Sequence, residues 1–359
     1  MQLRSDVPIA LLLSGGIDSS LLATKISKYY KKKLSTFSIY DSKDKTYDER
    51  DNINIILKKL KIKKNVKIDF VNEFSLNRLK KAISYQDAPL LTITDFAKNI
   101  LAEKISKTEN KVVITGNGAD EFFSGYFHHH LQYLLDIKRD KNTKLFKNYY
   151  KNWRLNILPQ VRNKIFKNLQ KFKLQKRKYI YDDYMSLNNF FLKPSKPKLK
   201  FKKNNSSLLK DSLLKEIFIE HVPHYTVSDD ANFMQFSLEN RSPYLCKNMF
   251  EFLQNVPTKF FLHNGYSKYI LRRILNRKLP NNIVWDPIKR GFNFSIFKLI
   301  NLKSKKFRKF INKKSNIYKI ISKRNFIEFL NENKKKEINL NNKFLFRFIS
   351  VKIFLELNS

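Results

Sequence analysis

The sequence contains very little glycine. Only seven of its 359 residues are glycine, whereas average usage of about 7% would give roughly 25. If substitution has removed glycine wherever a side chain is tolerated, the survivors mark positions at which only glycine fits. Two of the seven are adjacent, Gly15 and Gly16, and three more fall within 116–125. We expect the functional sites at these two clusters.

Cysteine and long apolar segments are also scarce. Cys246 is the single cysteine, which excludes an intrachain disulfide framework and a cysteine-based zinc cluster. No uncharged apolar run approaches the roughly 18 residues that a membrane-spanning helix needs. The opening MQLRSDVPIALLLSGG has a short apolar stretch without a small-residue cleavage site. These absences predict a soluble, cytoplasmic protein without membrane insertion.

Acidic residues are few, 31 against 72 Lys and Arg, and the formal net charge is +41. Such a charge is compatible with a nucleic-acid partner, because clustered cations release counterions from phosphate. However, the bias towards Lys, Asn, Ile, Phe and Tyr runs along the whole chain, and no RNA-binding signature, zinc-finger spacing or basic zipper is present. We interpret the charge as drift over a solvated surface and disfavour a nucleic-acid partner.

What is present is ample material for a core, since 42% of the residues are apolar. Apolar and β-branched runs predict strands at 7–13, 34–40, 66–71 and 111–115, and helical patterns predict helices at 18–31, 47–60, 73–84 and 93–107. Strands alternating with helices in this way predict an α/β fold with an open, doubly wound parallel sheet.

Strand signals stop after about residue 127. Helical patterns follow at 206–221, 229–237, 246–254, 266–277 and 326–357, which predicts a mainly helical C-terminal half. We therefore expect three units: an α/β portion at 1–137, a variable Lys-rich helical insert at 138–205, and a helical portion at 206–359.

The first glycine cluster lies between a predicted strand and a predicted helix. Backbone N–H groups and hydroxyls at such a helix start form an anion cradle, here contributed by Ser14, Gly15, Gly16, Ser19 and Ser20. Asp18 would repel phosphate unless a cation intervenes, so it implies Mg²⁺. The alternative is a simple capped turn with Ser or Asp as N-cap. That alternative is disfavoured because a second cluster accompanies the first.

The second cluster, TGNGADEFFSGY at 115–126, also follows a predicted strand. Because parallel strands open their carboxyl ends at one edge, the two clusters should lie together. Asp120 can then share the metal with Asp18. Glu121 could do the same, or could cap the following helix. The consecutive His128, His129 and His130 should point in different directions, and we interpret them as a solvated or substrate-rim feature.

Five blocks resemble successive signatures of the synthetase domain of the asparagine synthetase family. They are SDVPIALLLSGGIDSSLLA, GNGADEFFSGY, SLENRSPYL, YSKYILR and LPNNIVWDPIKRGF, in that family's order. The resemblance spans residues 5 to 294 and implies the fold of the N-type ATP pyrophosphatases, also called PP-loop enzymes. Ser14 to Ser20 would bind the pyrophosphate of ATP.

The resemblance further implies the site residues and cofactors, ATP and Mg²⁺. Mg²⁺ would be held by Asp18 and Asp120. Adenosine would be enclosed by Leu13, Ile39, Thr115 and Gly116. Catalytic roles would fall to Lys268, which stabilises charge near the α-phosphate, and to Glu239 and Asn117. The substrate pocket would include Glu121, Arg241 and Lys289. The reaction would be adenylation of a carboxylate, by default aspartate, with loss of pyrophosphate, followed by attack of ammonia on the acyl-AMP.

Three departures leave the substrate open. No glutaminase domain is expected before the strand that begins within ten residues of Met1, so ammonia would be free or supplied by a separate glutaminase subunit. Asn117 replaces a usual acidic residue, and Cys246 replaces a usual aspartate. One alternative is therefore amidation of another carboxylate, such as a uronic-acid sugar in surface-polysaccharide biosynthesis. Others are a basic, nucleic-acid-linked PP-loop protein, such as a tRNA-modifying enzyme, and a ligand-binding relative without turnover.

Overall fold

The structure is a computed structural model. It describes residues 2–30, 34–44, 48–161, 164–168, 190–193, 207–288, 294–332 and 340–359. Lys289, which was expected in the substrate pocket, lies outside the described residues.

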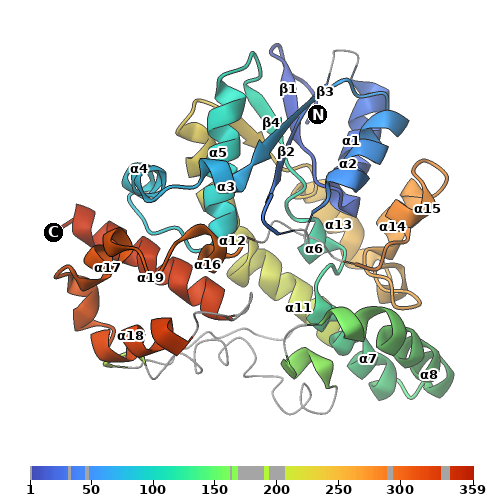
Figure 1. The fold of residues 1–359 in the computed structure, drawn as a ribbon. Coiled ribbons are helices and arrows are strands. Elements are labelled where there is room, and N and C mark those ends of the chain that lie inside the picture. The colour runs from blue at the N-terminus through green and yellow to red at the C-terminus, as the bar shows by residue number, and fades with distance from the viewer. Residues whose placement is uncertain are drawn as a thin grey trace.

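The centre of the molecule is a five-stranded, all-parallel sheet in the order β3-β2-β1-β4-β5 (Figure 1). The strands are β1 (Ile9–Leu12), β2 (Ser35–Tyr40), β3 (Lys64–Asp69), β4 (Val112–Ile114) and β5 (Glu239–Arg241). The α/β class and the four expected strands are confirmed. Because all strands run the same way, the loops after β1, β2 and β4 open at one edge of the sheet.

The fifth strand corrects the expectation that strands end near residue 127. β5 is only three residues long and polar, so neither length nor alternation predicts it. Backbone bonds to the neighbouring strand define it: Glu239 N donates to the Lys111 carbonyl at 2.8 Å, and Thr115 N donates to the Arg241 carbonyl at 2.9 Å. The adjacent Leu238 is fully buried and anchors the strand.

One face of the sheet carries the first hydrophobic cluster. Alternate strand residues point to opposite faces, and Ile9 and Leu11 point into this cluster. The helices that pack there include α1 (Ile17–Tyr29), α2 (Arg50–Lys59), α6 (Ala119–Phe122), α7 (Phe127–Arg139), α8 (Thr143–Asn152), α11 (Leu208–Lys215), α13 (Lys247–Asn255), α14 (Tyr269–Leu275) and α15 (Asn281–Val284). Short turns near this face are the π-helices η2 (Trp153–Ile157) and η6 (Glu216–Glu220) and the 3₁₀ turns η3 (Leu158–Gln160), η4 (Lys164–Lys167) and η7 (Thr258–Phe260).

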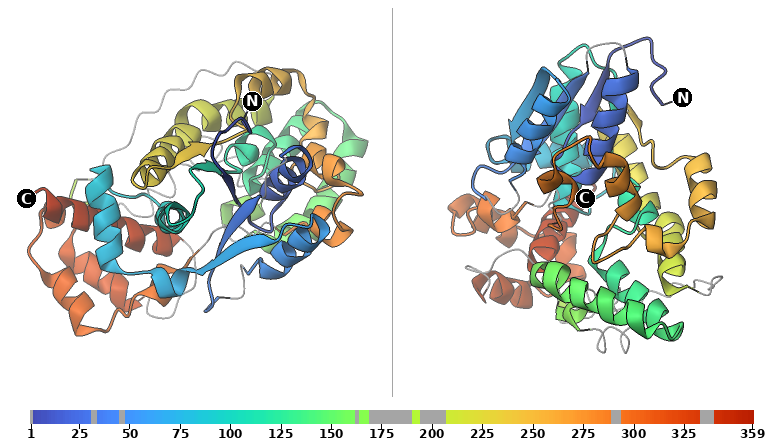
Figure 2. Two further views of the ribbon diagram at one scale, coloured as in Figure 1. Left: turned by 90° about the horizontal axis from the view of Figure 1, so that it is seen from above. Right: turned by 90° about the vertical axis from the view of Figure 1, so that its right-hand side faces the viewer.

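The opposite face carries the second cluster, into which Ala10 and Leu12 point. It is covered by α3 (Phe70–Glu73), α4 (Leu76–Gln86), α5 (Ile93–Ser106), α12 (Val222–Met234), α16 (Ile296–Leu299), α17 (Lys305–Asn312), η8 (Asn316–Lys319), α18 (Lys323–Glu332) and α19 (Leu340–Leu357). The C-terminal helices lie beside α4 at one end of the molecule (Figures 1 and 2). The mainly helical C-terminal half is thus confirmed.

The described parts of segment 138–205 pack on both faces of the sheet, with Phe190 and Phe191 against the second cluster. Tyr149 and Trp153 are each 1% exposed and belong to the first cluster. The division into three units stays a prediction.

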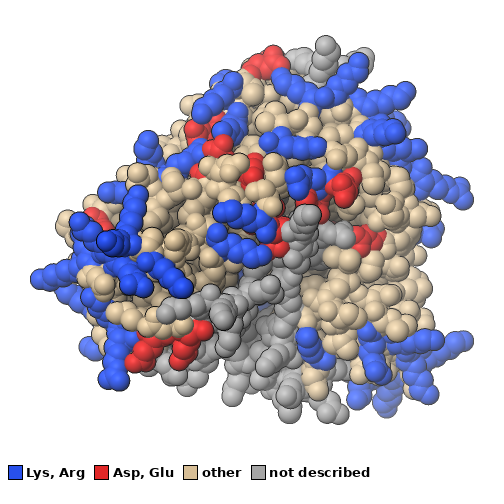
Figure 3. Space-filling model, viewed as in Figure 1, with Lys and Arg blue, Asp and Glu red and all other residues tan. Residues whose placement is uncertain are grey.

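The cationic side chains do not mark one element. Lys and Arg cover much of the visible face, over the C-terminal helices and also around the sheet (Figure 3). Among the described helices, none has both the length and the apolarity that crossing a membrane requires.

Candidate active site at the carboxyl edge of the sheet

The loop between β1 and α1 is a tight turn held by its own serines. Ser14 N donates to Ser19 Oγ at 3.1 Å, and Ser19 Oγ donates back to the Ser14 carbonyl at 2.8 Å. Ser20 Oγ bonds the Gly16 carbonyl at 2.6 Å. Gly16 is the N-cap of α1 and has no side chain that could bond the first N–H groups. The start of this 13-residue helix therefore offers N–H groups and a positive dipole end to an anion.

Gly15 has a packing role. A Cβ at this position would lie 2.7 Å from Asn52 Cβ and 3.0 Å from Glu49 Cβ, so a side chain would collide with the start of α2. The missing side chain allows the loop to pack directly against that helix.

A lysine joins the two loops. Lys268, only 7% exposed, places Nζ 2.5 Å from Asp18 Oδ2 and 2.6 Å from Asp120 Oδ1. Burial opposes the charged form of Lys268, but Asp120 and Asp18 outweigh it and raise the pKa of Lys268 well above its usual value. Gly125 makes the approach possible, because a Cβ there would lie 1.7 Å from Asp120 Oδ1.

The positions expected around adenosine come together at the same edge. Leu13 directly follows β1, and Ile39 is the last residue but one of the neighbouring β2. Both are buried. The Leu13 carbonyl accepts a 2.7 Å bond from Ser38 Oγ. A Cβ on Gly116 would lie 3.3 Å from Asp18 Cβ, so this glycine packs against the first loop. Thr115 Oγ1 and Ser242 Oγ are 3.0 Å apart, which ties the second loop to the segment after β5.

A cavity of about 750 Å³ opens beside these loops. Its wall is formed mainly by polar and charged residue types, namely Gln2, Arg4, Asn117, Thr226, Asp230, Glu239, Asn240, Arg241 and Ser242, together with Leu245. Hereafter we call it the acceptor cavity. Three residues expected in the site, Asn117, Glu239 and Arg241, lie on this wall, and the structure does not place Glu121 there.

Glu239 and Arg241 engage each other. Arg241 Nε lies 2.7 Å from Glu239 Oε1, and a second nitrogen lies 3.0 Å from Oε2. This guanidinium holds the pKa of Glu239 below its usual value. The remaining Arg241 nitrogen donates to the carbonyls of Gln2 and Arg4 at 3.0 and 2.7 Å. Arg241 thus anchors the N-terminal segment to the cavity wall.

Glu121 lies in a separate buried position. It is 1% exposed and accepts bonds from Tyr126 Oη at 2.5 Å and from Tyr225 Oη at 3.3 Å. Burial and the Glu121 charge raise the pKa of both tyrosines, so both remain donors. Glu121 therefore ties the second loop to α12.

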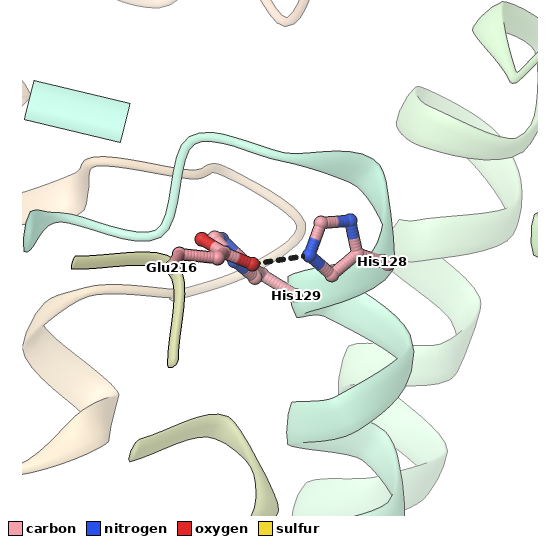
Figure 4. A group of neighbouring side chains, drawn as sticks. All are labelled: His128, His129 and Glu216. Atoms are coloured by element: carbon pink, nitrogen blue, oxygen red, sulfur yellow. Dashed lines mark hydrogen bonds and ion pairs between the residues drawn. The ribbon is translucent and has the colours of Figure 1, made fainter. Parts of the chain in front are cut away.

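The three histidines correct a prediction. His128, His129 and His130 are 8%, 0% and 2% exposed, so they are neither solvated nor on a rim. His128 Nε2 lies 2.6 Å from Glu216 Oε1, and His129 Nε2 lies 2.9 Å from the same oxygen (Figure 4). Neighbouring side chains on α7 do diverge, but a carboxylate on η6 is reached by both rings. The directions of side chains on one helix could not predict this pairing, because Glu216 belongs to a different element.

These two histidines and Glu216 form a group that could hold a metal ion, with ligand atoms within 4.8 Å of one another. The hydrogen bonds argue for a proton instead. Tyr126 N donates to His129 Nδ1 at 3.3 Å, so this nitrogen carries the lone pair and Nε2 carries the hydrogen. A metal at Nε2 would require the opposite tautomer, with two N–H groups facing each other. We interpret the group as a hydrogen-bonded clasp between α7 and η6.

Several wall and support residues were not singled out from the sequence. Lys98 and Asp229 form a buried ion pair behind Asn117, and Arg4 and Asp230 line the cavity. Lys98 and Asp229 are 131 residues apart, and nothing local distinguishes them from other charged helix residues.

Comparison with known proteins shows the family of the chain. The family model described as asparagine synthase matches residues 1–351. The chain is 26% identical over 309 residues to glutamine-hydrolysing asparagine synthetase 1 of Bacillus subtilis, covering 79% of this chain and 46% of that protein. It is 24% identical over 303 residues to asparagine synthetase 3 of the same bacterium, covering 79% and 45%. It is also 34% identical over 138 residues to the amidase chry2 of Gibberella zeae, covering 35% and 21%. The chain thus spans about half the length of the asparagine synthetases that it matches along most of its own length.

Proposed function

This chain belongs to the asparagine synthase family, and from that premise we propose that it is an ATP-dependent ligase that converts a carboxylate into an amide. The observation that carries the proposal is the meeting of an anion-binding helix start, two aspartates and a buried lysine at one edge of the sheet, where Asn117 of the second loop also lines the acceptor cavity. In this proposal the β1–α1 loop binds the phosphates of ATP. The acceptor carboxylate enters through the acceptor cavity.

The donor set fits Mg²⁺. Asp18 and Asp120 direct carboxylate oxygens at a common point, where Lys268 already supplies positive charge, and oxygen ligands are the ones Mg²⁺ prefers. When bound, Mg²⁺ would neutralise phosphate charge. The same two residues would hold it, with Lys268 moving towards the α-phosphate.

The chemistry follows from what the residues can do. A carboxylate oxygen of the acceptor attacks the α-phosphorus of ATP, the bond to the bridging oxygen breaks, and pyrophosphate leaves. Lys268 stabilises the charge that develops on the phosphate oxygens. Ammonia then attacks the acyl carbon, the carbon–oxygen bond to AMP breaks, and the amine loses a proton. Glu239, a carboxylate on the cavity wall, is the group that we propose takes this proton.

Aspartate remains our default acceptor. Arg4 and Asp230 both line the cavity, and neither has an ion-pair partner among the residues that the structure describes. An acceptor with a carboxylate and an ammonium would satisfy both. The size of the cavity, about 750 Å³, and its Asn, Ser and Thr side chains favour the second candidate, a uronic-acid sugar, whose hydroxyls these groups can bond. Ammonia would be free or supplied by a separate glutaminase subunit.

ATP–pyrophosphate exchange with a panel of carboxylates tests the proposal. Aspartate, succinate and a uronic acid separate the requirement for an ammonium from the requirement for hydroxyls. We expect either the amino-acid carboxylate or the uronic acid to support ATP–pyrophosphate exchange, and the same carboxylate to form an amide when ammonia is added. Asp18→Asn should abolish exchange while the far-UV circular dichroism remains that of the wild type. If the wild-type chain exchanges with none of these carboxylates, the proposed adenylation is wrong.

A further inference from the structure

Asn117 lies between the acceptor cavity and a fully buried ion pair. Its amide nitrogen donates to Asp229 Oδ2, and Lys98 Nζ lies 3.4 Å from its amide oxygen. Lys98 also bonds both oxygens of Asp229, at 2.8 and 2.7 Å. The three side chains therefore form a closed ring of hydrogen bonds, and each end of the Asn117 amide has its own partner.

The ring has one opening to the cavity. Asp229 is 0% exposed and Lys98 is 8% exposed, and neither lines the cavity, whereas Asn117 does. The ring uses one of the two amide hydrogens of Asn117 and one of the two lone pairs of its oxygen. One hydrogen and one lone pair remain for a ligand.

A buried pair of this kind carries an energetic cost. Removing two charges from water costs several kcal/mol per ion before the attraction is counted. Other bonds already join α5 to α12 and its C-cap: Asn99 Nδ2 donates to Gln235 Oε1 at 2.6 Å, and Asn232 Nδ2 donates to the Asp95 carbonyl at 3.0 Å. Holding α5 against α12 therefore does not explain why a charged pair lies behind the cavity wall.

We propose that Lys98 and Asp229 are positioning residues that lock the Asn117 amide in one orientation, so that the acceptor cavity presents a neutral donor–acceptor pair at this point. Without the ring, the two ends of the amide could exchange by rotation, because they have nearly the same shape. With the ring, rotation would point the amide N–H groups at Lys98 and the oxygen at Asp229. The cavity therefore selects for an acceptor group that both donates and accepts a hydrogen bond, such as a hydroxyl. This selectivity rests on the proposed function, because it assumes that the cavity takes the acceptor.

The proposal predicts that a carboxylate is not tolerated at residue 117 while Asp229 remains. Asn117→Asp would bring two carboxylates together around one lysine, with Asp95 close enough to act on Asp229 as well. Like charges at this distance share a proton. We expect Asn117→Asp to lower the thermal melting temperature at pH 8 and to recover most of the loss at pH 5. Tyr225, whose ring lies 5.8 Å from Lys98 Nζ, faces the same ring of bonds and remains neutral at both pH values.

The transposed double variant N117D/D229N is the decisive rescue. It keeps one carboxylate, one amide and Lys98. The folding equilibrium constant at pH 8 should therefore return to within about twofold of the wild-type value. The carboxylate would then border the cavity. We expect a KM for the acceptor at least tenfold higher than in the wild type, with the KM for ATP unchanged.

Asn99→Ala is the matched control, because it removes a hydrogen bond between α5 and the C-cap of α12 outside the cavity. In the double variant of Asn99→Ala and Asn117→Ala, the loss in the folding equilibrium constant should equal the product of the two single losses. In the double variant of Asp229→Asn and Asn117→Ala, the loss should be at least fivefold smaller than the product of the single losses. Independent effects of Asp229→Asn and Asn117→Ala, or no pH-dependent recovery in Asn117→Asp, would overturn the proposal. These stability measurements need no substrate, so they decide the positioning role even if the adenylation reaction is wrong.

Discussion

The ammonium of Lys268 lies 2.5 Å from Asp18 Oδ2, although 250 residues separate the two in the chain. Lys268 is the N-cap of α14 and has a left-handed backbone, with φ of 54°. This conformation is unfavourable for a lysine, so the surrounding contacts must hold it. Strain of this kind tends to occur at functional sites, and here it directs the side chain at both aspartates.

Lys268→Ala should lower pyrophosphate exchange by about 10²–10³-fold, because it removes the charge that we propose stabilises the transferring phosphate. It would also leave Asp18 and Asp120 facing each other without the ammonium that now lies between them. Exchange rates at saturating ATP and acceptor measure the effect. Lys247→Ala, at a lysine with 84% of its side chain exposed, is the control and should leave the rate unchanged.

Gly125→Ala should lower pyrophosphate exchange by displacing Asp120 and Lys268, if these two residues act as we propose. The added Cβ would lie 1.7 Å from Asp120 Oδ1 and 2.5 Å from Lys268 Cε. The neighbouring side chains must move, so we expect a loss of at least tenfold in exchange with circular dichroism unchanged. A fully active alanine variant would show that the close approach of Asp120 and Lys268 is not needed.

Asp136→Ala should destabilise the fold by about 2–3 kcal/mol, because a single carboxylate caps the start of α11. Asp136 accepts bonds from Ser207 Oγ at 2.7 Å, Leu208 N at 2.8 Å and Leu209 N at 3.1 Å. Urea unfolding measures the change. Asp140→Ala, at an aspartate with 66% of its side chain exposed on the same helix end, should change the free energy of unfolding by less than about 0.5 kcal/mol.

Stability should fall with pH below about 6.5 because His130 is buried as the neutral form. Burial, with His129 and Arg272 nearby, lowers the pKa of His130 to about 3. The unfolded chain then binds a proton that the folded chain does not, so this stabilisation is complete above the unfolded pKa and is lost as pH falls towards 3. The expected slope from His130 is about 1.4 kcal/mol per pH unit between pH 6 and pH 4.

Urea unfolding at pH 7, 6 and 5 measures that slope. His130 Nδ1 lies 2.7 Å from Tyr149 Oη, so His130→Asn keeps a polar partner there and should flatten the slope by this amount. An equal slope in His130→Asn and the wild type would contradict the assignment.

Much of the site could be predicted because its chemistry is local in sequence. The surviving glycines lead to both loops, and Asp18 and Asp120 follow strands whose carboxyl ends necessarily meet in a parallel sheet. Gly15, Gly116 and Gly125 each lie where a Cβ would meet another segment within 3.3 Å. The scarcity of glycine was informative because a glycine at a close backbone approach cannot be replaced by a residue with a side chain.

The amino-acid sequence by itself determined the four longer or apolar strands, the two glycine-containing loops after β1 and β4, and the family. Only the tertiary structure decided the rest. β5 depends on backbone pairing with β4, Glu216 is reached by histidines from another helix, and Asp229 meets Asn117 across 112 residues. The physical reason is the same in each case: a buried charge or a polar strand has no stable local conformation of its own, and its partner is supplied by distant segments only when the chain folds.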